Sequence, residues 1–155
     1  MNGWAQTIER LYVVEAVKSS FVVYPLINAL HIAAIGGLLT CVVLMDLRLL
    51  GRFHDLPQPA FVGLLRRVAI TAFGLSLLTG AAMFAIRATD YASSPLFWIK
   101  MGLIVFAGLN FALFSAIDRR RPPETPLPAL ARLSALASIA LWFSTLIAGR
   151  FLGFA

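Results

Sequence analysis

Four long apolar segments decide what this chain can fold into. They run from about Phe21 to Leu44, Val68 to Ile86, Leu96 to Ile117 and Leu130 to Ala148. A helix needs about 20 apolar residues to cross the roughly 30 Å hydrocarbon core of a bilayer. Barrel strands would be short and would alternate, whereas these runs are continuous. The sequence therefore predicts one all-α domain over residues 1–155, an integral membrane four-helix bundle.

Composition favours lipid over water as the solvent. Of the 155 residues, 60% are hydrophobic and 13% are charged, whereas a soluble domain carries roughly a quarter charged residues. The formal net charge is +6, but the arginines flank the apolar runs, so no nucleic-acid interface is expected. Cys41 is the single cysteine and lies inside an apolar run, which predicts a small core hydrophobe without an intrachain disulfide.

Local signals mark where the helices begin and end. Pro25 lies in the opening turn of the first span, and Gly51 is placed to end that helix. Residues 93–95 form the start of the third span, and the proline-rich stretch 121–126 separates it from the fourth. Before the first span, residues 1–20 place an apolar set on one side of a helical wheel, which predicts a short helix lying in the membrane interface. That set is Trp4, Ile8, Leu11 and Tyr12.

The distribution of arginine predicts the orientation. The first and third connections between spans carry most of the basic residues, namely Arg48, Arg52, Arg66, Arg67, Arg119, Arg120, Arg121 and Arg132. The second connection has Arg87, which is offset by Asp90, and the C-terminal end has Arg150. Because cytoplasmic loops are enriched in Lys and Arg, we expect both termini on the outer side.

His31 is the first polar group that suggests chemistry. It lies inside the first span and shares a helix face with Tyr24 and Asn28. Polar side chains inside a membrane are costly and commonly functional, and imidazole is a frequent ligand of haem iron and of metals. The alternative is a histidine that only forms a hydrogen bond to a neighbouring helix.

Lys100 is the second such group, about one turn inside the third span. It either extends toward the outer headgroups, which lowers the cost of its charge, or contacts a bound group inside the bundle. Spans one and three start on the same side, so Lys100 and His31 are expected at similar depth. The contact is the interpretation we favour.

The predicted topology gathers polar and sulfur-containing side chains in the outer half of the bundle. They are Tyr24, Asn28, His31, Met83, Arg87, Lys100 and Arg150. This set would suit haem b, with His31 on the iron and the cations paired with the propionates. The inner half offers little beyond Asn110. Asp46 and Arg48 are expected to pair with arginines of the loops, and His54 lies in a connection too far from the outer half.

Several motifs resemble a poorly characterised family of small bacterial four-span proteins. They are the runs 24–31 and 46–51, Leu78-Thr79-Gly80, Tyr91, Phe97 with Lys100, Asn110, and Gly149-Arg150. The family implies a multi-pass protein of the bacterial inner membrane. More distantly, the first-span histidine and the Phe-x-x-Lys start of a later span resemble CopD/HemJ-type proteins. One branch of these is linked to copper uptake, and the other binds haem b and oxidises protoporphyrinogen, but this chain is shorter and lacks their histidine-rich surroundings.

Three functions follow as expectations. The first is a haem-b-binding electron-transfer or oxidase-like protein, whose redox partner would be a quinone or another protein. Because only one histidine lies within a span, a bis-histidine haem would need two chains, and within one chain the sixth ligand would be Met83, Met101, Lys100 or none. The second is copper handling by His31 with Met83 or Met101. The third is a non-catalytic accessory subunit or scaffold, in a homo-oligomer or a larger membrane complex.

Overall fold

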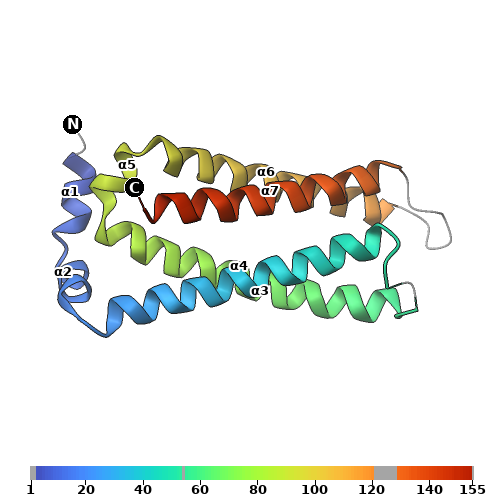
Figure 1. Ribbon diagram of the computed structural model, residues 1–155, viewed down its shortest axis with the longest axis horizontal. Helices are drawn as coiled ribbons and strands as arrows, with labels where there is room; N and C mark the ends of the chain where they lie inside the picture. The colour runs from blue at the N-terminus through green and yellow to red at the C-terminus, as the bar shows by residue number, and fades with distance from the viewer. Residues whose placement is uncertain (1–2, 54, 121–128, 155) are drawn as a thin grey trace.

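The computed structural model describes residues 3–53, 55–120 and 129–154, with only the backbone of residues 58, 59 and 117–120 (Figure 1). This part of the chain is helical and contains no strand. Its seven helices are α1 (Gly3–Glu9), α2 (Tyr12–Ser19), α3 (Val23–Leu49), α4 (Gln58–Ile86), α5 (Ala88–Ser93), α6 (Pro95–Arg120) and α7 (Ala129–Leu152). The predicted all-α fold is confirmed. His54 and the proline-rich stretch 121–126 lie outside the described residues.

Four helices are long and apolar enough to cross a membrane: α3, α4, α6 and α7. The second of them begins at Gln58, ten residues before the predicted start of the span at Val68. Arg66 and Arg67 interrupt the hydropathy there, but arginine is a good helix former, so the helix continues through them. Large apolar side chains point outward, as Phe21 (98% exposed) and Leu78 (73%) do. A multi-pass membrane protein explains such a surface, because lipid covers it.

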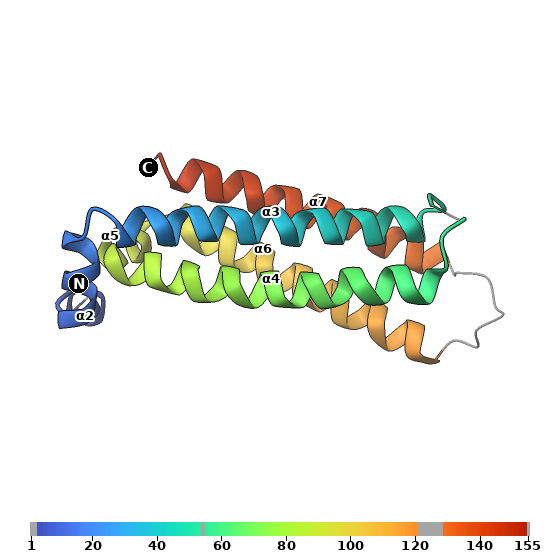
Figure 2. The ribbon, with the colours of Figure 1, turned by 90° about the horizontal axis from the view of Figure 1, so that it is seen from below.

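The bundle is built from two helical hairpins, α3–α4 and α6–α7, that meet along α3 and α7 (Figures 1 and 2). The core between them is small and contains Cys41, as predicted, with Leu38 and Val42 of α3 and Ala69 of α4. Trp142 of α7 packs against this cluster and meets the ring of Phe73 edge-on, 6.0 Å between centroids.

Side chains, rather than close backbones, connect α4 to α6. Within the described residues the Cα atoms of these two helices do not approach within 8 Å. At one end Phe84 stacks on Phe97, with ring centroids 5.2 Å apart. At the other end the guanidinium of Arg66 lies 6.0 Å from the centroid of the Phe111 ring.

Gly51 ends α3, as its position in the sequence predicts. Its φ of 94° lies in the left-handed region that favours glycine. The amide of Gly51 donates to the carbonyl of Arg48 at 3.2 Å, and the amide of Arg52 donates to the carbonyl of Leu47 at 2.9 Å. These bonds satisfy carbonyls that the end of a helix leaves without partners.

Three short helices, α1, α2 and α5, cover one end of the bundle (Figure 1). The sequence predicted one short N-terminal helix, and the chain forms two. The Glu9 carboxylate accepts a hydrogen bond of 2.7 Å from the Thr89 amide in the first turn of α5. Trp4 stacks on Phe84, with ring centroids 6.3 Å apart. The N-terminal segment is therefore fixed to the bundle by a charged contact and an aromatic contact.

Both described ends of the chain lie at this capped end, and α3 ends and α4 begins at the other (Figure 1). We call the capped end the outer end and the opposite end the inner end, following the predicted orientation. Which of them faces the cytoplasm stays a prediction from the arginines.

Cysteine labelling tests this orientation. In a Cys41→Ser background, Arg52→Cys and Ser93→Cys place single thiols at exposed positions near the two ends. We expect an impermeant maleimide added outside intact cells to label position 93 and to leave position 52 unlabelled until the membrane is permeabilised. The reverse labelling pattern would show that the bundle has the opposite orientation in the membrane.

Candidate functional site

His31 lies half-buried on α3 and faces α4. Its Nδ1 is 2.8 Å from the Oγ1 of Thr79. The Thr79 hydroxyl already directs its one proton to the carbonyl of Leu75, 2.7 Å away. It must therefore accept from His31, which places the imidazole proton on Nδ1 and leaves the Nε2 lone pair available.

Two further groups of α4 lie against the ring of His31. The backbone carbonyl of Ser76, a second acceptor, lies against the imidazole and 3.3 Å from Thr79 Oγ1. Gly80, the next residue of α4, gives the ring its space, because a Cβ at this position would be 3.1 Å from His31 Cε1. A hydrogen bond from Nδ1–H to a protein acceptor is the usual arrangement of a histidine that binds a metal through Nε2.

Lys100 reaches into the bundle from the start of α6. Its side chain lies half-buried against α7, where a Cβ on Gly149 would be 3.2 Å from Nζ. It is also an electrostatic neighbour of His31. Lys100 is thus within electrostatic range of His31, the residue that the sequence placed at similar depth, and its side chain runs along α7 rather than away from the protein.

The other predicted site residues lie around this pair or at the outer rim. Tyr24 and Asn28 are half-buried on α3, toward the outer end from His31. Met83 is half-buried on α4, four residues after Thr79, which puts the two on one helix face. Met101 is half-buried too, but it follows Lys100 directly, so the two side chains point in different directions.

Arg87 and Arg150 are exposed at the rim and already have partners. Arg87 pairs with Asp90 at 2.9 Å, and that hydrogen bond raises the pKa of the guanidinium. Arg150 lies over the ring of Phe154, 4.3 Å from its centroid. Beside Arg87, burial raises the pKa of the Tyr91 phenol. Tyr91 stacks on Phe84, so the outer end combines aromatic rings with two surface cations.

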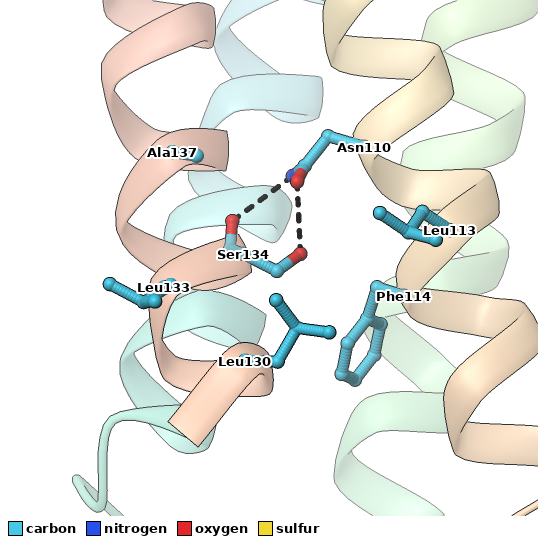
Figure 3. Close-up of a pocket in the computed structure, with 7 residues that line it drawn as sticks. All are labelled: Asn110, Leu113, Phe114, Leu130, Leu133, Ser134 and Ala137. Atoms are coloured by element: carbon cyan, nitrogen blue, oxygen red, sulfur yellow. Dashed lines mark hydrogen bonds between the residues drawn. The ribbon is translucent and has the colours of Figure 1, made fainter. Parts of the chain in front are cut away.

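Asn110, the polar residue that the sequence placed in the inner half, has a partner on α7 that the sequence did not indicate. Asn110 of α6 donates to the Ser134 carbonyl and accepts from the Ser134 hydroxyl, both at 3.0 Å (Figure 3). A hollow of about 210 Å³ opens beside this pair. It is lined by Leu113, Phe114, Leu130, Leu133 and Ala137. Two mutual hydrogen bonds satisfy the Asn110–Ser134 pair, so it ties α6 to α7.

Asp46 also departs from its expected pairing. The sequence predicted loop arginines as its partners, but its hydrogen-bond partner is the hydroxyl of Ser138 on α7. Arg48, the neighbouring cation, donates instead to the carbonyl of Leu56 at 3.1 Å. Ser134 and Ser138, four residues apart on α7, both bond to side chains of other helices.

Metal ligands of the common kinds do not gather in the described part of the chain. No three His, Cys, Asp or Glu side chains lie together there. A metal bound at the outer site would therefore rely on the His31 imidazole with a thioether or with ligands from outside the chain.

Comparison with models of protein families identifies a family for this chain. Residues 2–155 match the model of a family described as "Family of unknown function (DUF6644)". Neither the curated proteins nor the solved structures contain a match. The more distant resemblance to CopD/HemJ-type proteins stays a prediction.

Proposed function

We propose that this chain, which belongs to the DUF6644 family of unknown function, is a haem-b-binding redox protein with His31 Nε2 as the iron ligand. The observation that carries the proposal is the contact between His31 and Thr79. It holds the imidazole proton on Nδ1 and leaves Nε2 as a neutral nitrogen donor inside a membrane span.

The residues around His31 fit a bound haem. Lys100, half-buried beside His31, offers a positive charge to a propionate. Met83, four residues after Thr79 on the same face of α4, would offer a thioether as a second ligand. Such ligation raises the reduction potential. Haem would supply one-electron chemistry, while the chain binds it, orients the ring of His31 and keeps water away.

Aromatic side chains at the outer end of the bundle would help to keep water out of the proposed site. Trp4, Phe84, Tyr91 and Phe97 form a cluster of stacked rings at the outer end of the bundle. The haem would then exchange electrons either with a quinone dissolved in the lipid or with a partner protein that docks at this aromatic end. We place the protein in a bacterial inner membrane, with the outer end facing away from the cytoplasm.

Absorption spectroscopy with metal analysis tests the proposal. Protein purified in mild detergent from cells supplied with a haem precursor should show a Soret band that shifts on reduction with dithionite. Bound copper without haem would favour copper handling by His31 with Met83. Absence of both would favour an accessory subunit or scaffold, and either result would overturn the haem proposal.

Lys100→Arg tests whether the lysine contacts the bound group. The Lys100 Nζ already lies close to α7 at Gly149, so the wider, planar guanidinium has little room. We expect a shifted Soret maximum and a changed midpoint potential. Lys18→Arg, at an exposed position on α2, is the matched control and should change neither. A Lys100→Arg protein with the wild-type spectrum and potential would remove Lys100 from the site.

A further inference from the structure

Asp46 is a carboxyl group buried at the inner end of the bundle that the proposed haem site does not use. It lies on α3, one turn before the helix ends at Leu49, and is 7% exposed. Its Oδ2 has no hydrogen-bond partner. The one hydrogen bond that the described residues give its carboxyl comes from Ser138 on α7.

The charged groups around Asp46 are directed elsewhere. On its own helix, Arg48 donates to the Leu56 carbonyl. On α4, Arg66 lies over the Phe111 ring, and Arg67 lines a groove beside Ala33 and Ala34. On α7, Arg132 is exposed. Asp46 is thus buried with Ser138 as its polar neighbour, and its Oδ2 is left without a hydrogen bond from the described residues.

The negative charge of an ionised Asp46 would be buried without an ion pair and with too few hydrogen bonds. A buried charge is stable only when it is paired or has several hydrogen bonds. One serine hydroxyl gives a single donor and no charge. A bound proton removes this charge. Ser134, the next serine of α7, already exchanges hydrogen bonds with Asn110 and so does not serve Asp46.

We propose that Asp46 is a proton-binding carboxyl, occupied at neutral pH and exchanging its proton with water at the inner end of the bundle. The proposal does not depend on haem at His31, which lies in the outer half. A proton is the ligand because one carboxyl and one hydroxyl are too few protein oxygens for a hard cation such as Ca²⁺, which takes six to eight.

A hydrophobic carbodiimide tests this assignment in the full-length protein. The O–H of a protonated carboxyl adds across one C=N bond, forming a C–O bond and an N–H bond, and rearrangement gives a stable N-acylurea without oxidation or reduction. At neutral pH, peptide mass spectrometry should find the adduct on Asp46, and alkaline pH should suppress it. Asp46→Asn should remove this adduct, whereas Asp90→Asn, at the exposed outer rim, should retain it.

Ser138→Ala separates proton binding from simple accessibility. Ser138 donates to the charged form, so its loss favours the proton, and labelling of Asp46 should persist to higher pH. Ser134→Ala, one turn away on α7, should leave the pH dependence unchanged. If the pH dependence of Asp46 labelling is the same in Ser138→Ala and in the wild type, Ser138 is not the partner of Asp46.

Infrared spectroscopy of the wild-type protein gives a test that needs no variant. A protonated carboxyl has a carbonyl stretch that a carboxylate lacks, and this band shifts in D2O. We expect such a band at neutral pH, absent from Asp46→Asn where that protein folds. Wild-type protein without the band and without the carbodiimide adduct would overturn the proposal.

Discussion

Replacing His31 by alanine is expected to abolish haem binding while the protein still inserts in the membrane. The substitution removes the proposed iron ligand and its hydrogen bond to Thr79. Losing an interhelical hydrogen bond in a membrane costs roughly 0.6–1.7 kcal/mol, which the remaining contacts between α3 and α4 can tolerate. Haem per chain, from the pyridine haemochrome spectrum, should fall to the background level.

His54→Ala is the matched control, because it removes the other histidine of the chain. It should leave the haem content at the wild-type value. Gel filtration in detergent separates loss of ligand from loss of fold. A folded His31→Ala protein that retains its haem would show that the ligand is another residue.

Gly80→Ala is expected to weaken haem binding without removing the ligand. The added Cβ would lie 3.1 Å from His31 Cε1, so the ring must move against its hydrogen bond to Thr79. Changes to groups that orient a metal ligand typically cost about 10–100-fold in affinity. A haem titration of protein purified without haem measures the change in Kd.

Gly74→Ala provides the comparison on the same helix. Nothing lies within 4 Å of a Cβ at that position, and alanine is the better helix former. Haem affinity should therefore stay at the wild-type value. Equal effects of the two substitutions would mean that Gly80 acts through α4 as a whole and not through the ring of His31.

The fold was largely predictable because lipid makes one demand on every span. Backbone polar groups must be satisfied within the segment, so four long apolar runs could only be helices, and Gly51 ended the first as expected. The start of α4 was not predictable from hydropathy, since Arg66 and Arg67 are helical but polar. The second N-terminal helix depends on tertiary contacts, Glu9 with Thr89 and Trp4 with Phe84, which no local pattern encodes.

The outer site was predictable only in part. Helix periodicity and topology placed His31 and Lys100 at one depth, and the structure makes them neighbours. Thr79 could not be predicted as the partner of His31, because one sequence does not show which faces of α3 and α4 meet. The same limit hid Ser138 as the partner of Asp46. Serines recurring at spacing four on α7 were the available signal, since small polar residues in spans bond across helices as well as allow close packing.

Magnetic resonance can measure directly whether a nitrogen of His31 is bonded to haem iron. The protein would carry His54→Gln, which leaves His31 as its one histidine, and would be grown with 15N-labelled histidine. Pulsed electron paramagnetic resonance of the ferric form should then show a 15N nucleus coupled directly to the iron. Bound haem without this coupling would show that His31 is not the iron ligand, and protein that binds no haem would show that the chain is not a haem protein.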